Sequence, residues 1–370
     1  MPEPLKNHFG TDVPATIAAM VSAVYPGFDA AAFIQDALQG YEDLELMPRG
    51  RQVADALHSH LPQEYPKAVA ILVASAAQPV ARVVGSGMGG FLFMPHMFYI
   101  AEHGLAHFEP SMRALHTLTQ RFTAEFAIRP FLQAHPERTL RQLDIWTRDP
   151  DEQVRRLVSE GTRPRLPWAS RLPQFQHDPQ PVLRLLEHLK DDPSLYVRRS
   201  VANNLNDIGK DHPQLLTDIA RRWLVAASPE REWIVRHALR WAVKQGDAGA
   251  LDVLGFGARA QVRVDEICIR PAVVPLGGTV QLAFVLHSSA TRVQDLLVDL
   301  KVHYVKAGGG TSAKVFKLKA LQLGARDAAR LQKKLSLADL STRRHFPGEH
   351  RVDVLVNGQV FPIGSFTLGG

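Results

Sequence analysis

The 370-residue sequence predicts a mainly α-helical protein, in which a solenoid of helical repeats at residues 1–254 is followed by an antiparallel β-sandwich at residues 255–370. Two observations lead to this prediction. Apolar residues recur at intervals of three and four through the first part, whereas short β-rich runs alternate with turn signals after about residue 255. The length fits two domains or one long array of repeats.

Three similar blocks divide the end of the helical part. They read DPDEQVRRLVSEG, DPSLYVRRSVANN and SPEREWIVRHALRW, and each predicts an N-cap followed by a first-turn proline, at Pro150, Pro193 and Pro229. An amphipathic segment precedes each block, and the blocks recur after 43 and then 38 residues. Helix pairs repeating about every 40 residues are typical of HEAT-like solenoids, which present a concave surface built from every second helix.

Seven β-rich runs follow the helical part. They are VRVDEICI, GTVQLAFVLHSS, LLVDLKVHYVK, AKVFKLKAL, ARLQKKLSL, HRVDVLVNG and FPIGSFTL. This number of short strands in about 110 residues favours an antiparallel sandwich of immunoglobulin-like (Ig-like) size. The chain has one cysteine, Cys268, which excludes an intramolecular disulfide and a cysteine zinc cluster. Because the Cys…Trp…Cys pattern is absent, "Ig-like" describes the expected architecture alone.

The overall charge favours a polyanionic partner. The formal net charge is +6 and the sequence pI is about 9.5, a modest basic excess for this length. The N-terminus, MPEPLKNHFG, lacks the layout of a signal peptide, and we find no apolar run of about 18 residues. We therefore expect a cytoplasmic protein with no membrane partner.

One helical segment, YVRRSVANNLNDIGKDHP at residues 196–213, places short polar residues beside its core stripe. The stripe consists of Val197, Val201, Leu205 and Ile208. Ser200, Asn204 and Asp207 form a second stripe on its flank, at helical spacing. An exposed helix face, with Asp207 paired to a neighbouring basic residue, is one interpretation. However, Asn, Ser and Asp are poor helix-interior residues, so a plain solvated face would more often use Glu, Lys and Gln.

Two further acids join Asp207 as candidates. Glu160 belongs to the preceding block, 43 residues before Asn203, so two carboxylates could approach each other on adjacent concave helices. Glu125, in RFTAEFAIRPFL, is expected in an otherwise apolar helix, one turn from Arg129. Each acid alone is more simply structural, but together they place three acids near arginines.

The segment GTRPRLPWASRLPQFQHDPQP at residues 161–181 is a long connection for a solenoid. One interpretation is a proline-stiffened surface loop. The other is a finger of arginines and Trp168 that reaches phosphates and sugar or base faces.

Other motifs are weak. GSGMGG at residues 85–90 lacks the spacing and the Lys-Ser/Thr of a phosphate loop, so we expect an interhelical loop. His103 and His107 have the i, i+4 spacing of metal ligands, but no HExxH pattern or cysteine supports them. We expect no metal and no cofactor.

The block YVRRSVANNLNDIGKDHP, with RFTAEFAIRPFL and VSEGTRPRLPW upstream, resembles the bacterial DNA alkylation-repair glycosylases of the HEAT-like repeat superfamily, specifically their AlkC branch. LKNHFG near the N-terminus and the C-terminal β domain also fit this branch, so the resemblance spans essentially the whole chain. It implies excision of N3-alkylated bases, notably 3-methyladenine and 3-methylcytosine, from double-stranded DNA without flipping the lesion into a deep pocket. It also implies a cofactor-free monomer in the bacterial cytoplasm, associated with the nucleoid.

The resemblance assigns roles to particular residues. It implies that Glu125, Glu160 and Asp207 are the catalytic acids. The residues expected to bind DNA are Trp168, Arg155, Arg156, Arg163, Arg165, Arg171, Arg198, Arg199, Asn203 and Asn204. The β domain would close round the opposite side of the duplex through Lys301, Lys306, Lys314, Lys317 and Lys319.

The chemistry is reasonable independently of the resemblance. N3-alkylation gives the base a positive charge and makes it a good leaving group. Negative charge near the sugar then stabilises the developing oxocarbenium ion, and a carboxylate can orient or deprotonate water. The same acids could also attract cationic lesions.

Two alternatives remain open at the level of sequence. One is a non-enzymatic HEAT-repeat scaffold that binds nucleic acid or protein, since such repeats are mostly binding platforms. The other is an RNA-binding repeat protein, which fits the charge but not the acids. Carboxylates more than about 15 Å apart would favour the scaffold, because one active site works within hydrogen-bond reach.

Overall fold

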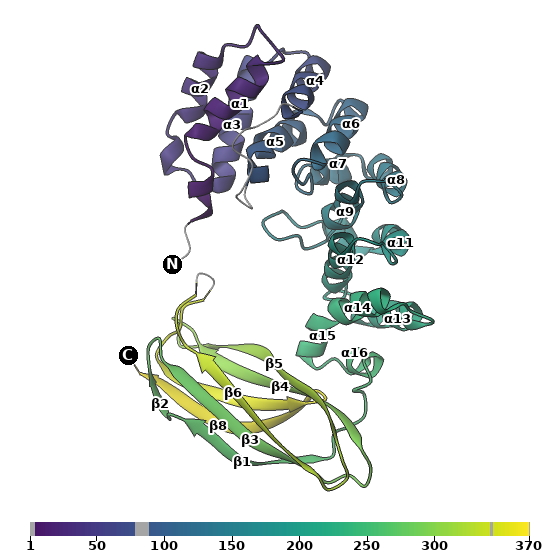
Figure 1. Cartoon of the computed structure of the whole chain (residues 1–370), viewed down its shortest axis with the longest axis vertical. Helices are drawn as coiled ribbons and strands as arrows, with labels where there is room; N and C mark the ends of the chain where they lie inside the picture. Colours follow the sequence, from purple (N-terminus) through teal and green to yellow (C-terminus); the bar gives the residue numbers. More distant parts are fainter. Residues whose placement is uncertain (1–3, 78–88, 341–342, 370) are drawn as a thin grey trace. The chain divides into compact units, whose positions relative to one another are not determined.

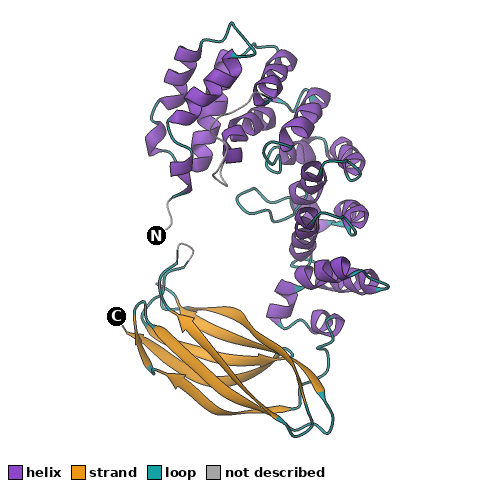
Figure 2. Ribbon diagram, in the orientation of Figure 1, coloured by secondary structure: helices purple, strands orange, loops and turns teal. Residues whose placement is uncertain are grey.

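The computed structural model describes residues 4–77, 89–340 and 343–369, and the chain forms two compact units. The helical unit comprises Glu3–Asp211 and Ala227–Ala238, and the mixed unit comprises His212–Ala226 and Leu239–Gly370. Figures 1 and 2 show helices through the first part of the chain and strands toward its C-terminus. This order confirms the predicted fold class.

The helical unit is built from helices that pack on near neighbours in the chain. They are α1 Asp12–Ser22, α2 Ala30–Leu38, α3 Leu46–His60, α4 Tyr65–Ala76, α5 Met94–His103, α6 Phe108–Thr119, α7 Ile128–Ala134, α8 Pro136–Trp146, α9 Glu152–Gly161, α10 Pro173–His177, α11 Gln180–Leu189, α12 Leu195–Ile208 and α14 Pro229–Ala238. The 3-10 helices are η1 Leu5–His8, η2 Tyr41–Asp43 and η3 Gly89–Phe93. Among the neighbouring pairs, α3 packs on α5, α9 on α12 and α12 on α14. In Figure 1, α9 and α12 lie side by side, and α8 and α11 form a second layer against them.

Apolar residues at intervals of three and four bury one face of each repeat helix. The predicted core stripe of α12 is buried throughout: Val197, Val201, Leu205 and Ile208 are each at most 1% exposed. In α11, the spacing of Val182, Leu185, Leu186 and Leu189 gives the same result. This packing fixes the rotation of α12 and therefore the direction of its polar flank.

The predicted N-caps are wrong for two of the three blocks. α9 begins after Asp151, whose carboxylate accepts from the Gln153 N–H at 2.7 Å, and α12 begins after Ser194. The aspartates before the two prolines instead form turns just before the helices begin. The carboxylates of Asp149 and Asp192 accept hydrogen bonds from the backbone N–H groups of Asp151 and Ser194. In the third block α14 does begin at its proline.

The mixed unit contains three helices and the strands. The helices are α13 Pro213–Leu224, α15 Arg240–Gln245 and α16 Ala248–Val253. The strands are β1 Val262–Arg270, β2 Val273–Pro275, β3 Thr279–Ser288, β4 Gln294–Val305, β5 Thr311–Leu323, β6 Ala328–Ser336, β7 Gly348–Val356 and β8 Gln359–Gly369. The expected domain boundary after residue 254 falls between α16 and β1. Because the mixed unit groups three helices with the strands, an independent domain at 255–370 stays a prediction.

The strands form two sheets, ordered β1-β3-β6 and β2-β8-β7-β4-β5. The seven predicted strands are all present, and the short β2, which sequence analysis missed, pairs with β8 in parallel. The other pairings are antiparallel. Alternate residues bury the inner faces, such as Leu282, Phe284 and Leu286 in β3 and Val352 and Val354 in β7.

No helix within the described ranges is both long and apolar enough to cross a membrane. The glycine-rich segment at 85–90 lies outside the described residues except for Gly89 and Gly90, which begin η3.

Candidate active site

The three candidate acids come from two packed helices and one turn. Glu160 lies in the last turn of α9 and Asp207 in the last turn of α12. Glu125 was expected in a helix but lies in the turn before α7, where Thr123 donates to its carboxylate at 2.8 Å. All three are buried, with exposed fractions of 9% for Glu125, 5% for Glu160 and 1% for Asp207.

Two arginines join the acids into one network. Arg163 donates to Glu160 Oε1 at 2.5 Å and to Asp207 Oδ2 at 2.8 Å. Arg156 binds the carboxylate of Glu125 and lies 3.6 Å from Glu160 Oε1. Because Glu160 and Asp207 share one guanidinium, their nearest oxygens are at most about 8 Å apart. This separation is well below the distance of about 15 Å above which a non-enzymatic scaffold would be favoured.

The network balances its charges. Lys210 donates to the second oxygen of Asp207 at 2.8 Å, so Arg156, Arg163 and Lys210 face Glu125, Glu160 and Asp207. Burial alone would lower the pKa of Arg163, but Glu160 and Asp207 raise it above the ordinary arginine value. These acids are therefore held between cations, and they do not form a purely negative surface.

Arg129 fixes the loop that follows α9. Its guanidinium is almost completely buried and donates to the carbonyls of Gly161, Arg163 and Ser170 at 2.9, 2.8 and 2.5 Å. Burial and the nearby Arg163 lower the pKa of Arg129 to about 10. The sequence places Arg129 one turn from Glu125 but predicts no role for it, because its contacts reach residues more than 30 positions away and leave no local signal.

Trp168 stands at the outside of this loop. Its side chain is 67% exposed, and its φ of 65° lies in the left-handed region, which costs a non-glycine residue about 1–2 kcal/mol. The Leu172 N–H donates to the Pro164 carbonyl at 3.1 Å and closes the loop around it. The exposed indole agrees with the expected contact to DNA, which stays a prediction.

The polar flank of α12 turns out to be the contact surface with α9. Ser200, 2% exposed, donates to Glu160 Oε2 at 2.6 Å and accepts from Ser159 at 2.7 Å. Asn204 is completely buried, and its amide donates to the Ser159 carbonyl at 2.8 Å and to the Thr162 hydroxyl at 3.1 Å. The expectation that Asn204 binds DNA does not fit this structure, because no surface of it reaches solvent.

Arg155 and Arg198 occupy equivalent positions in consecutive repeats and close the same turn. Arg155 donates to the carbonyls of Asp149 and Pro150 and binds Asp192 of the next repeat at 2.6 and 3.1 Å. Arg198 donates to the equivalent carbonyls, those of Asp192 and Pro193, at 2.8 and 2.7 Å. Both side chains stabilise the repeat structure and are partly exposed, so their contact with phosphates stays a prediction.

The other expected DNA-binding residues divide by exposure. Arg165 binds Asp211 through two nitrogens, and Asn203 lies 3.3 Å from the His237 ring of α14. Arg171 and Arg199 have exposed side chains. Arg171 and Arg199 are therefore better placed than Arg163 to reach a phosphate, since Arg163 is buried between two acids.

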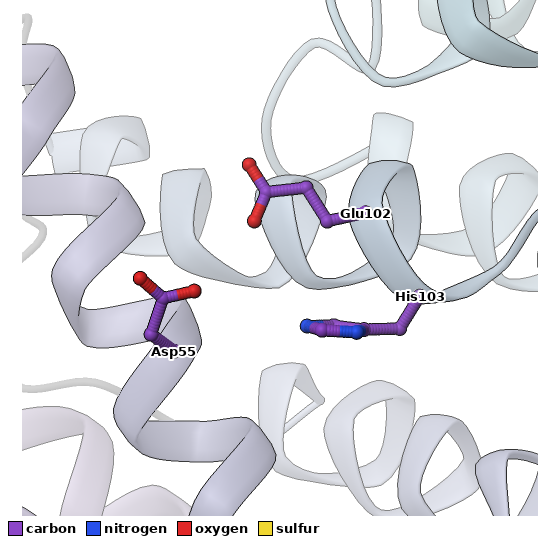
Figure 3. Close-up of side chains that lie close together, drawn as sticks. All are labelled: Asp55, Glu102 and His103. Carbon is purple, nitrogen blue, oxygen red and sulfur yellow. The ribbon is translucent and has the colours of Figure 1, made fainter.

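His103 and His107, which have the spacing of metal ligands, do not come together, in line with the expectation that they hold no metal as a pair. His103 stacks on His58 at 3.7 Å, whereas His107 stacks on Tyr65 at 4.8 Å. His103 instead lies beside Asp55 and Glu102, with the possible ligand atoms of the three within 4.8 Å of one another (Figure 3).

Arg51 supplies a positive charge to this second group. Its guanidinium lies 3.4 Å from Glu102. Burial and the neighbouring Asp55 raise the pKa of Glu102 above its ordinary value. Arg51 therefore offsets part of the negative charge of this group.

The lysines of the β domain lie on or beside β4 and β5. Lys301 is in β4, Lys306 follows it, and Lys314, Lys317 and Lys319 are in β5. Burial and the adjacent Arg343 lower the pKa of Lys314 below its ordinary value. Contact of these lysines with DNA stays a prediction.

The fold and the network define the chain as a helical-repeat protein with a C-terminal Ig-like domain and a buried acid–arginine site. Residues 263–370 match the family model described as "Uncharacterised protein YhaZ, C-terminal Ig-like domain". The uncharacterized protein YhaZ of Bacillus subtilis strain 168 is 37% identical over 357 residues, which cover 96% of this chain and 97% of that protein.

A solved structure matches the whole chain. It is the Pseudomonas fluorescens alkylpurine DNA glycosylase AlkC, bound to DNA containing an abasic site analog. The sequences are 42% identical, the TM-score is 0.91, and the match covers 100% of both chains. The chain belongs to the AlkC family, which confirms the resemblance read from its motifs.

Proposed function

We propose that this protein is a DNA glycosylase that hydrolyses the N-glycosidic bond of cationic N3-alkylated bases, such as 3-methyladenine and 3-methylcytosine, in duplex DNA. The observation that carries the proposal is the network of Glu125, Glu160 and Asp207, three buried carboxylates held by shared arginines. The full-length similarity to an alkylpurine DNA glycosylase solved on DNA supports it.

Carboxylates suit this reaction because the alkylated base already carries a positive charge. The base leaves without strong acid assistance, and positive charge develops on the sugar as the bond breaks. A fixed carboxylate beside the sugar stabilises that charge, and a second can orient or deprotonate the attacking water. In our proposal Glu125, Glu160 and Asp207 share these two tasks.

The charge balance bears on how lesions are selected. Because Arg156, Arg163 and Lys210 already compensate the three acids, a cationic base gains little net attraction from the network. We therefore place the preference for alkylated bases in the bond-breaking step, where a cationic base is the better leaving group, and less in binding. This revises the expectation that the acids attract cationic lesions.

We further propose that the lesion does not insert fully between the helices. Arg156 and Arg163 occupy the space between the acids, which argues against a flipped base entering there. The exposed Trp168, Arg171 and Arg199 would hold the duplex from outside.

The test measures base release from methylated duplex DNA by the wild type and by Glu160→Gln. The variant keeps the size of the side chain and removes its charge, so we expect base release to fall by roughly a hundredfold or more, with DNA affinity largely unchanged. Glu137→Gln is the matched control, because Glu137 lies on α8 with its side chain 86% exposed.

Two results would count against the proposal. A wild type that releases neither 3-methyladenine nor 3-methylcytosine would favour the non-enzymatic scaffold. Release at the wild-type rate by Glu160→Gln would remove the role assigned to Glu160.

A further inference from the structure

The α12 side chain that lies against Arg156 is Tyr196, which sequence analysis did not single out. The Arg156 guanidinium carbon lies 5.0 Å from the centroid of the Tyr196 ring, within the range of a cation–π contact. Tyr196 is in the first turn of α12, and Ser200, which binds Glu160, is one turn further along.

The backbone of Tyr196 is fixed at the start of α12. The Ser194 hydroxyl caps α12 by accepting from the Tyr196 N–H at 3.2 Å, and the same hydroxyl donates to Glu152 at the start of α9. Arg156 follows Glu152 by four residues, so the two helices meet at successive turns, with Ser194 against Glu152 and Tyr196 against Arg156.

Arg156 has several partners, which together restrict the orientation of its guanidinium group. It donates to the Thr123 hydroxyl at 2.6 Å, binds Glu125, and lies 3.6 Å from Glu160. A planar guanidinium that serves two carboxylates must stay in one plane. An aromatic face beside the guanidinium carbon restricts the movement of the group while leaving its N–H groups available to the carboxylates.

We propose that Tyr196 is a positioning residue, which acts through Arg156 to hold the carboxylates of Glu125 and Glu160 in their catalytic arrangement. The proposal rests on the proposed glycosylase function. It assigns the effect to the face of the ring, so the hydroxyl is dispensable. Tyr196 is 38% exposed, and partial burial raises the pKa of its phenol above the ordinary value, so the hydroxyl is neutral in ordinary assay buffers, as it would be without the shift.

Two variants separate the role of the aromatic ring from that of the hydroxyl and of apolar bulk. Tyr196→Phe keeps the ring and removes the hydroxyl, whereas Tyr196→Leu keeps an apolar side chain and removes the ring. We expect Tyr196→Phe to release 3-methyladenine under single-turnover conditions within twofold of wild type. Tyr196→Leu should be slower by roughly three- to tenfold, the range that a cation–π contact supports, with its duplex Kd within twofold. Thermal melting of both variants checks that each is folded.

Two further measurements exclude a direct contact of Tyr196 with DNA. In an Arg156→Gln background, Tyr196→Leu should cause no additional loss of rate, because its target is already absent. In the free protein, the ring-current shift on the Arg156 side-chain resonances should persist in Tyr196→Phe and disappear in Tyr196→Leu.

The proposal is overturned if folded Tyr196→Leu works at the wild-type rate, if its defect lies in Kd, or if the defect adds in full to that of Arg156→Gln. Absence of base release by the wild type would instead overturn the proposed function. The ring-current shift, which needs no activity, would then support or overturn the contact between Tyr196 and Arg156.

Discussion

Replacing Arg163 with methionine tests whether this arginine holds the acids together or grips DNA. Arg163 is 8% exposed, and its guanidinium is shared between Glu160 and Asp207. Methionine fills a similar volume but supplies no charge, so the variant leaves two buried carboxylates without their common partner.

The structure sets the size of the expected loss. Removing one member of a buried ion pair typically costs about 3–5 kcal/mol of unfolding free energy. Here Glu160 would retain the Ser200 hydroxyl at 2.6 Å, and Asp207 would retain Lys210 at 2.8 Å. These remaining partners place the expected loss near the lower end, at about 3 kcal/mol.

Urea unfolding followed by circular dichroism measures this loss, with Arg165→Met as the control. Arg165 lies two residues further along and also pairs with an aspartate, Asp211, but both side chains are more than 20% exposed. The control should therefore lose about 1 kcal/mol or less. The double variant Arg163→Met/Asp207→Asn should lose less stability than the sum of the two single variants, because Asp207→Asn removes a carboxylate that has already lost its arginine partner.

Salt dependence of duplex binding separates the two roles of Arg163. If Arg163 were a phosphate contact, Arg163→Met would be as stable as the control and its plot of log affinity against log salt would be shallower by about 1. That combination would refute the reasoning, whereas a large stability loss with an unchanged slope would support it.

The remaining predictions concern buried polar groups. Asn204→Ala should lower the unfolding free energy, measured by urea unfolding, by about 1–3 kcal/mol, because it removes two buried hydrogen bonds between α9 and α12. The affinity for duplex DNA at constant salt should not change. A stable variant with lower affinity would instead indicate that Asn204 contacts DNA. Burial lowers the pKa of His96 to about 4 in the folded protein. As the pH falls below about 6.5, the imidazole therefore binds a proton in the unfolded chain but not in the folded protein, and the free energy of unfolding should fall until the pH reaches about 4. The decline attributable to His96 is about 3 kcal/mol at most, and urea midpoints at pH 7, 5.5 and 4.5 should show a shallower decline for His96→Gln. Equal declines in the two proteins would contradict the assignment.

Periodicity was enough to predict the architecture. The repeated blocks became α9, α12 and α14, and the spacing of Val201, Leu205 and Ile208 identified the buried stripe. The strands could be predicted because β-rich runs alternate with turn signals, and some of them, such as β7, carry core residues at alternate positions. The short β2 was missed because three residues are too few to show a period.

The closeness of the three acids was predicted from the sequence, whereas the partners of the arginines were not, and the catalytic role of the acids stays a prediction. Two adjacent arginines on a helix point in different directions, and nothing local tells which one meets a neighbouring repeat. Arg155 turns to Asp192, 37 residues away, whereas Arg156 turns to Glu125, 31 residues back. Such choices depend on the packing of three segments, so a pattern within one segment cannot reveal them.

Asn204 and Glu125 show two further limits of sequence patterns. Asn204 belongs to a polar stripe of α12 whose composition suggests a binding surface, but this stripe packs against α9. Glu125 was placed in a helix because apolar spacing continues across the end of α6, and periodicity does not detect the turn that separates α6 from α7.

The contacts between α9 and α12 restrict how this array can change in length. Repeat proteins often gain or lose whole units, since each unit contacts only its neighbours. Here a unit inserted between α9 and α12 would separate Glu160 from Ser200 and Arg163 from Asp207. Duplication is therefore incompatible with the site at this junction, and engineered repeats could be added only where neighbouring units share no acid–arginine contact.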